Sequence, residues 1–223
     1  MTGVLRAEEY GVPQTRRRAI LIAHQFLTPA LPVTTHQRFR RTQVQTTAEQ
    51  SALLPCRSIG QTLNRLEPFE LVSNYGTGGD PKARGRRTSK EPAFTVTGKV
   101  SRNRLFSNAR ELDRLKLSEA GLLQTFPANY PWSGKDVSQQ IGNAIPPRLA
   151  AHVLAAALGL ELHPSFYDTA TRRPWSPAGK GLSNSALPEA VHGFPAHGVD
   201  RDSVGRRSDH LPTPLASASP GAL

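Results

Sequence analysis

The stretch YGVPQTRRRAILIA, Tyr10 to Ala23, places three consecutive arginines directly before a run of five apolar residues. The run AILIA, residues 19–23, is short and continuous, and prolines follow it at positions 29 and 32. This pattern predicts a β-strand buried on both faces rather than an amphipathic strand. Three charged side chains directly before a buried strand are unusual, and they require either solvent or a specific partner.

Side-chain alternation divides the arginines unequally. If residues 14–18 are extended, Gln14, Arg16 and Arg18 point to one side, and the two residues between them point to the other. Arginine stays charged and presents planar paired donors, which suit a phosphate or the carbonyl edge of a base. The alternative is a solvated, charged entrance to the strand, and the local sequence alone does not separate the two.

Composition indicates a polyanionic partner. The 223 residues carry a formal net charge of +11. Residues 161–223 hold six basic and six acidic residues, so the excess lies in residues 1–160. A single cysteine excludes an intrachain disulfide framework, and the sequence has no apolar signal region or membrane-spanning run. We expect a cytoplasmic protein that faces nucleic acid.

The middle of the chain differs from its ends. From about residue 28 to 112 the sequence is polar, basic and weakly periodic, with one β-rich piece, AFTVTGKV, at residues 93–100. This composition predicts a loop-rich module with short strands. The segment CRSIGQTLNRL, which begins at Cys56, is typical of a helix that opens such a module.

Two further helices are predicted after this module. In LSEAGLLQTFP, Ser118 can cap a short helix that ends before Pro127. In GNAIPPRLAAHVLAAALG, two prolines suit the first turn and Gly159 suits the end. The apolar face is supplied either by Leu149, Val153 and Leu160 or by Leu154 and Leu158. Beyond position 161 the sequence is rich in Pro, Gly and Ser without periodicity, which predicts disorder.

Three blocks resemble the C-terminal third of the DNA cytosine-5 methyltransferases. YGVPQTRRRAILIA resembles motif VIII, LSEAGLLQTFPANYPW resembles motif IX, and QQIGNAIPPRLAAHVL resembles motif X. They stand in the family's order, and three ordered blocks are far more specific than any one of them. With pieces that resemble a bacterial target-recognition region, the resemblance covers about residues 4–160.

The resemblance implies a fold and a division of the chain. The fold would be α/β: a C-terminal fragment of a doubly wound, Rossmann-like methyltransferase fold plus a small loop-rich β target-recognition domain and a disordered tail. The implied parts are the end of the catalytic domain at 1–27, the target-recognition region at 28–112, the motif IX and X helices at 113–160, and the tail at 161–223.

The resemblance also implies a reaction. In the family a cytosine leaves the duplex, a cysteine attacks C6, and S-adenosyl-L-methionine methylates C5; extrusion is needed because the reacting carbon is inaccessible in the stack. The matching positions assign Arg16 and Arg18 to orienting the flipped cytosine. They assign Asn143 and Ala144 to contact with the cofactor.

Double-stranded DNA is the partner that follows from this resemblance. The basic glycine-containing loop and the FTVTG piece would position phosphates or flank the flipped nucleotide. The residues expected to bind DNA are Gln14, Lys82, Arg84, Arg86, Arg87, Lys90, Thr95 and Thr97. Histidines show no metal-ligand spacing, so we propose no metal site.

Several family elements are absent from the sequence. It has no Phe-x-Gly-x-Gly cofactor loop, no Pro-Cys-Gln nucleophile loop and no Glu-Asn-Val block, and Cys56 stands after motif VIII with arginine in place of glutamine. We therefore expect a portion of a methyltransferase that is inactive alone. It is either one half of an enzyme split over two chains, with the other elements on a second chain, or a truncated product. Residues 1–27 should then be poorly stabilised or should expose an apolar patch.

Two other classes of protein remain to be weighed. The first is a non-catalytic DNA-binding module, retained or decaying. The second is an unrelated RNA-binding protein, which is disfavoured because aromatic residues make up only 6% of the sequence and provide no stacking platform.

Overall fold

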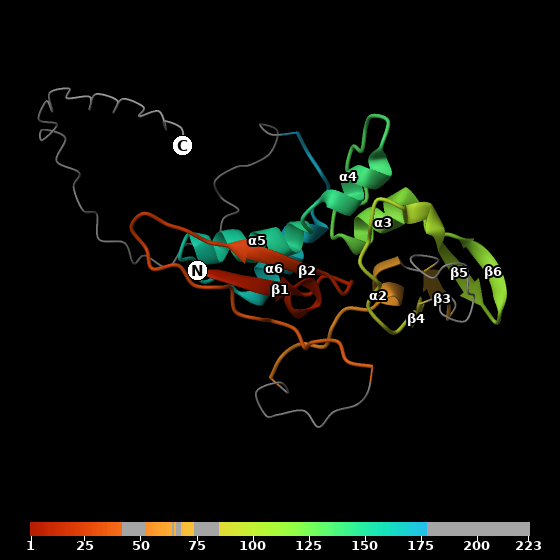
Figure 1. Cartoon of the computed structure of the whole chain (residues 1–223), viewed down its shortest axis with the longest axis horizontal. Helices are drawn as coiled ribbons and strands as arrows, with labels where there is room; N and C mark the ends of the chain where they lie inside the picture. The colour runs from red at the N-terminus through yellow and green to blue at the C-terminus, as the bar shows by residue number, and fades with distance from the viewer. Residues whose placement is uncertain (42–51, 64, 66–67, 74–84, 178–223) are drawn as a thin grey trace, which may run out of the picture. The chain divides into compact units, whose positions relative to one another are not determined.

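The structure is a computed structural model that describes residues 1–41, 52–63, 65, 68–73 and 85–177 (Figure 1). All of them belong to one compact unit, Met1–Ser183. Two predicted DNA-binding residues, Lys82 and Arg84, lie outside the described residues. So does the greater part of the predicted tail, residues 178–223.

The arginine-rich stretch enters a two-stranded antiparallel ribbon. β1 (Thr2–Arg6) pairs with β2 (Arg17–Leu21), and the 3₁₀ helix η1 (Ala7–Tyr10) follows β1 directly. Gly11 ends η1 with a φ of 75°, a left-handed conformation that glycine adopts without steric cost. The predicted strand is therefore present as β2, whereas the sequence analysis did not predict β1.

The prediction that this strand is buried on both faces is wrong. One face of the ribbon packs inward through Leu5 and Ile20, while the other exposes Val4 at 65% and Leu21 at 73%. Among the described residues β2 has β1 as its only neighbouring strand, so nothing described covers its second face. The apolar exposure expected in residues 1–27 is present.

The loop-rich middle region contains a four-stranded antiparallel sheet. The strands stand in the order β4 (Gly85–Thr88), β3 (Glu70–Ser73), β5 (Asn103–Ser107) and β6 (Arg110–Arg114). A short helix, α2 (Ile59–Leu63), precedes the sheet, as the sequence predicted, and a 3₁₀ turn, η2 (Val100–Arg102), leads into β5.

The β-rich piece at residues 93–100 is not a regular strand. Its backbone pairs with the segment before β2: Thr15 donates to the Ala93 carbonyl at 2.9 Å, and Ala93 donates to the Pro13 carbonyl at 2.9 Å. Beyond Ala93, side chains instead of a second strand satisfy the backbone of Val96. This explains the absence of a continuous ladder.

Three helices follow the sheet, namely α3 (Leu117–Leu123), α4 (Val137–Asn143) and α5 (Pro147–Ala157). Ser118 does not cap α3, because the helix begins one residue earlier and Glu119 accepts from the Lys116 amide at 3.0 Å. α4 was not predicted; Asp136 caps it by accepting from the Gln139 amide at 3.1 Å. Gly159 follows α5 in the expected left-handed conformation.

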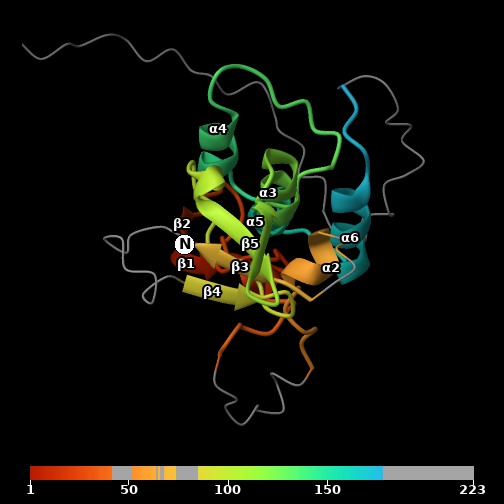
Figure 2. The same ribbon diagram turned by 90° about the vertical axis from the view of Figure 1, so that its right-hand side faces the viewer.

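Two apolar clusters hold these elements. The larger cluster joins α2, the sheet, α3 and α4, with Leu105, Leu123 and Ile141 fully buried (Figure 2). The smaller cluster joins β1, η1 and α5 through Leu5, Val12 and other residues, and Leu149 of α5 is buried in it. The predicted Leu149 face of α5 is thus the packed one.

Disorder was predicted from residue 161 onward, but residues 164–172 form a helix. α6 (Pro164–Arg172) begins with proline in its first turn, and its Tyr167 ring stacks on His152 of α5 with 3.5 Å between centroids. The prediction of disorder rested on the Pro, Gly and Ser content of residues 161–223 as a whole, and it missed the local signals of α6, which are Pro164 in its first turn and Arg172 in its last turn. Packing on α5 and one ion-pair cluster stabilise this helix.

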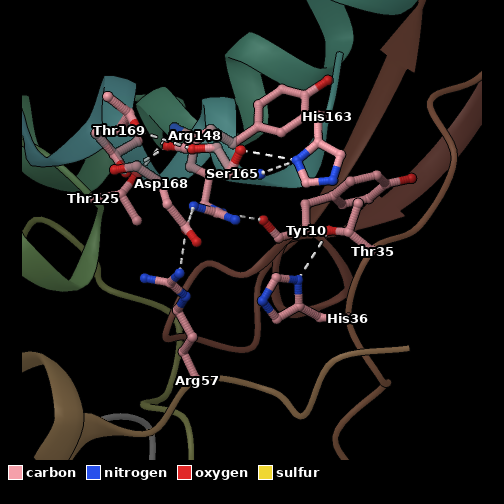
Figure 3. Close-up of polar contacts among 12 residues, drawn as sticks. Tyr10, Thr35, His36, Arg57, Thr125, Arg148, His163, Ser165, Asp168 and Thr169 are labelled. Atoms are coloured by element: carbon pink, nitrogen blue, oxygen red, sulfur yellow. Dashed lines mark hydrogen bonds and ion pairs between the residues drawn. The ribbon is translucent and has the colours of Figure 1, made fainter. Parts of the chain in front are cut away.

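That cluster centres on Arg148 of α5 (Figure 3). The Arg148 side chain is 1% exposed; its Nε donates to the Tyr10 carbonyl at 2.7 Å, and Nη1 pairs with Asp168 of α6. Arg57 pairs with the same carboxylate. Burial opposes ionisation of Asp168, but the two arginines outweigh it and hold its pKa below the usual value. α6 therefore supplies the counter-ion of a buried arginine.

Two buried histidines lie beside this cluster. Burial and the Arg148 charge lower the pKa of His152 to about 3, with His36 contributing. Burial, Arg148 and Arg57 lower the pKa of His36 to about 4, although Asp168 opposes the shift. Both pKa values lie below the ordinary 6.5, so unfolding takes up protons as the pH falls from 6.5 toward 4, and acid destabilises the fold.

His152→Phe should reduce this acid sensitivity. Phenylalanine keeps the stack on Tyr167 and removes an Nε2 atom that is buried without a partner. Thermal unfolding at pH 7.5 and pH 4.5 should show a smaller drop in Tm for this variant than for the wild type. His24→Gln, an exposed control, should keep the wild-type drop. An unchanged drop in His152→Phe would show that His152 does not carry the pH dependence.

Candidate functional site

A cavity of about 680 Å³ opens where the β1–β2 ribbon, residues 38–41 and β4 approach one another. Six arginines line it, together with one carboxylate, two threonines and one aromatic ring. The lining residues are Arg6, Glu8, Thr15, Arg17, Arg18, Arg38, Phe39, Arg41, Arg87 and Thr95. We call it the arginine cavity.

The arginine cavity carries a strong excess of positive charge, because six arginines and one glutamate line it. Glu8 is the only buried residue of its lining, and burial raises the pKa of its carboxyl group, which weakens it as a counter-ion. Glu91 beside the cavity accepts from Arg41 at 3.4 Å and lies 3.5 Å from Arg87. These carboxylates do not balance six guanidinium groups, so the cavity suits an anion with several oxygen acceptors.

Gln14 lies outside the arginine cavity, in a buried hydrogen-bond network. Its Oε1 accepts from the Val96 amide at 3.0 Å, and its Nε2 donates to the Leu123 carbonyl at 2.9 Å and to Gln124 Oε1 at 3.0 Å. Gln124 in turn donates to the Ile141 carbonyl at 2.6 Å. One amide thus joins the segment before β2 to the segments at the ends of α3 and α4.

Arg16 completes this network. Its side chain is buried, Nη1 donates to the Val96 carbonyl at 2.7 Å, and Nη2 donates to the carbonyls of Gly142 at 2.7 Å and Ala144 at 3.3 Å. Both of the latter carbonyls lie at the C-terminal end of α4, where backbone acceptors are free and a cation is favoured. Among the described residues no carboxylate pairs with Arg16, so backbone dipoles alone stabilise its charge.

The predicted convergence of Arg16 with Arg18 is therefore wrong. The predicted alternation itself is present, because Gln14, Arg16, Arg18 and Ile20 are each more buried than the residues between them. The two guanidinium groups nevertheless do not meet in one pocket, because that of Arg16 donates to backbone carbonyls. Gln14 and Arg16 point into the interior, whereas Arg18 lines the arginine cavity beside Arg17.

Asn143 ends α4 with its side chain exposed, and its Oδ1 accepts from Gln139 at 3.3 Å. The carbonyl of Ala144 is held by Arg16. Gly142 and Gly98 touch: a Cβ on Gly142 would overlap the backbone at Thr97 and Gly98. The segment that carries the predicted cofactor residues is thus fixed against the FTVTG segment.

Some of the other predicted DNA-binding residues line the arginine cavity and others do not. Arg87 and Thr95 line the arginine cavity. Arg86 points away from it to pair with Glu70 at 2.9 Å, and Lys90 and Thr97 are not among its lining residues.

Sequence analysis missed most of the lining, namely Arg6, Glu8, Thr15, Arg17, Arg38, Phe39 and Arg41. A signal was available at residues 37–41, QRFRR, where an aromatic residue stands among arginines. Only the tertiary structure brings that segment to β2 and β4.

Cys56 is a poor candidate for a nucleophile. Burial raises the pKa of its thiol, which disfavours the reactive thiolate, and Cys56 does not line the arginine cavity. Within the described ranges no three His, Cys, Asp or Glu side chains form a metal-binding group. In the same ranges, no helix is both long and apolar enough to span a membrane.

Comparison with known proteins decides the family. The family model described as C-5 cytosine-specific DNA methylase matches residues 2–158. The chain belongs to this family. The match contains the ribbon, the sheet and α3 to α5, and it ends before α6. Members of the family use S-adenosyl-L-methionine.

The chain is similar to curated relatives that are type II methyltransferases. It is 27% identical over 176 residues to M1.HphI of Haemophilus parahaemolyticus, covering 70% of this chain and 46% of the relative. It is 28% identical over 177 residues to M.BbvI of Brevibacillus brevis, covering 68% of this chain and 46% of the relative. It is 27% identical over 177 residues to M.HindV of Haemophilus influenzae, covering 73% of this chain and 53% of the relative. The chain spans about half the length of these relatives.

Arg16→Lys should destabilise the folded chain. An ammonium group cannot reach three carbonyls with the planar geometry of guanidinium, so the variant leaves buried acceptors unpaired. We expect the free energy of unfolding in urea to fall by about 3 kcal/mol. Arg17→Lys, at the exposed neighbouring position, should change it by less than about 0.5 kcal/mol. A variant as stable as the wild type but weaker in DNA binding would contradict the structural role.

Proposed function

We propose that this chain supplies the DNA-handling part of a cytosine-5 methyltransferase that acts on double-stranded DNA in the cytoplasm, within a restriction–modification system. The observation that carries the proposal is the arginine cavity, which gathers Arg18 of motif VIII, Thr95 and Arg87 in one place within a chain of this family. The reaction is methyl transfer to C5 of a cytosine extruded from the duplex.

Within this proposal the two arginines of motif VIII have different tasks. Arg18 faces the cavity and contacts the flipped cytosine or the phosphate beside it. Arg16 orients the site from the interior, because its contacts fix Val96, next to Thr95, and the segment of Asn143. Gln14 supports the same arrangement through the Val96 amide.

The cofactor edge of the proposed site lies at Asn143 and Ala144. The exposed carboxamide of Asn143 can hydrogen-bond a ligand, and the Ala144 backbone is held by Arg16, so both fit one edge of a site for S-adenosyl-L-methionine. When bound, the cofactor supplies the methyl group. The remaining contacts of such a site must come from other residues.

We further propose that the chain is incomplete as an enzyme. Cys56 is unsuited to attack on C6, and the exposed face of the β1–β2 ribbon, with Val4 and Leu21, is apolar enough to receive a complementary part. That part would carry the nucleophile and most of the cofactor site, in a second chain. The proposed divisions at residues 27, 112 and 160 follow the family resemblance.

A non-catalytic DNA-binding module is the second candidate. The observation in its favour is the lining of the arginine cavity, which offers six guanidinium groups to an anion and includes no cysteine that could act as the nucleophile.

The purified chain should transfer no labelled methyl group from S-adenosyl-L-methionine to duplex DNA. Addition of a neighbouring gene product that carries Pro-Cys-Gln and Phe-x-Gly-x-Gly blocks should restore transfer. Val4→Lys should block this restoration, because it charges the proposed docking face. Leu112→Lys, at an exposed position on β6, is the matched control and should not block it.

Each other outcome has a distinct meaning. Robust transfer by the chain alone would end the claim that it is incomplete. DNA binding without restoration by any such partner would favour the non-catalytic module. Restoration that Val4→Lys leaves intact would place the docking surface elsewhere.

A further inference from the structure

The guanidinium of Arg87 lies between two aromatic rings. Its Cζ is 4.5 Å from the ring centre of Phe39 and 4.9 Å from that of Phe94, distances typical of cation–π contact. Gly85, two residues earlier on β4, makes room for this arrangement, because a Cβ there would lie 2.8 Å from the Phe94 ring. The side chain is only 13% exposed, so its position is largely fixed.

The N–H donors of the Arg87 guanidinium are not all paired with an acceptor. Glu91 lies 3.5 Å from Nη1, but the same Glu91 oxygen also accepts from Arg41 at 3.4 Å. The Nε atom of Arg87 is buried without a hydrogen-bond partner. Because Nε is itself buried, it is the rest of the guanidinium that can reach a ligand. Arg87 lines the arginine cavity, and among the described residues its carboxylate partner is a Glu91 oxygen that Arg41 also uses, so its charge is incompletely neutralised there.

The neighbours of the Arg87 guanidinium indicate the ligand. Arg18, Arg38 and Arg41 line the same cavity, and the nearest buried carboxyl group, Glu8, has a pKa raised by burial. Several guanidinium groups around one small volume match the charge and the oxygens of a phosphate group better than the neutral edge of a base. In DNA that group is a backbone phosphodiester.

We propose that Arg87, fixed between Phe39 and Phe94, binds one backbone phosphate of duplex DNA, and that residues 38–41 form part of the DNA-binding surface. The inference rests on the proposed function in taking DNA as the ligand. It goes further in assigning one phosphate to one residue and in giving Phe39 a positioning role. Arg87 contributes to affinity at every sequence because a phosphate carries no base identity.

The test measures binding of the full chain to fluorescent duplexes by anisotropy over a series of salt concentrations. Arg87→Met keeps the aliphatic stem and removes the charge. It should weaken binding about tenfold and lower the slope of log K against log salt by about 0.9, the value for one phosphate. Arg110→Met, on β6 at the opposite edge of the sheet from β4, is the control and should stay within about twofold of the wild type.

Phe39→Leu tests the positioning role. It should weaken binding while leaving the salt slope unchanged, because the charge remains. Combined with Arg87→Met, it should add little further loss, since both variants disable one contact. Arg87→Lys should keep the slope and lose affinity, because the charge survives but the planar donor edge does not. Variants are compared only where thermal unfolding shows them folded at the assay temperature.

Three results would overturn the inference. The first is wild-type affinity and slope in Arg87→Met. The second is full additivity of the Phe39 and Arg87 variants. The third is a loss confined to G·C-rich duplexes, which would indicate a contact with a base edge.

Failure of the methylation proposal remains distinguishable from failure of this inference. Binding that depends on Arg87 without restored methyl transfer would reject the enzyme and keep the phosphate site. Restored methyl transfer, with DNA binding that does not depend on Arg87, would keep the enzyme and reject the phosphate site. A chain that binds no duplex would end both.

Discussion

A buried guanidinium group with no carboxylate partner among the described residues connects the parts of this molecule. Arg16 donates to carbonyls of Val96, Gly142 and Ala144, and Gln14 ties the same region to the ends of α3 and α4. A cation held only by backbone dipoles is stable when every acceptor keeps its place. The positions of Thr95 and Asn143, which are the proposed DNA and cofactor sides, therefore depend on Arg16 together with Gln14.

The elements that could be predicted from the sequence are those with a signal in their own residues. The strand at β2, the helices α2, α3 and α5 and the stop at Gly159 all have clear signals of composition or capping. α6 and the arginine cavity have only weak local signals, namely Pro164 and the arginines of residues 37–41. Asp168 stabilises α6 only when Arg148 is beside it, and Arg38 meets Arg18 only in the folded chain. Long-range ion pairs and cavities are products of tertiary structure.

The error concerning Arg16 and Arg18 has a specific physical cause. Alternation predicted the side of the chain correctly, since Gln14, Arg16 and Arg18 are all more buried than the residues between them. It does not predict what each side chain meets. The backbone of Val96 and the carbonyls at the end of α4 lack strand partners, so Gln14 and Arg16 bind them, and only Arg18 is left to line the arginine cavity.

The open face of the β1–β2 ribbon also bears on solubility. A short strand with an apolar outer face, and with one edge unpaired among the described residues, is a surface on which copies of a chain tend to associate. The net charge of +11 opposes that association by mutual repulsion. The proposed binding of DNA at the arginine cavity would neutralise part of this repulsion and so lower the barrier to contact at the ribbon. The proposed DNA binding and the association of copies would in this way be linked through charge.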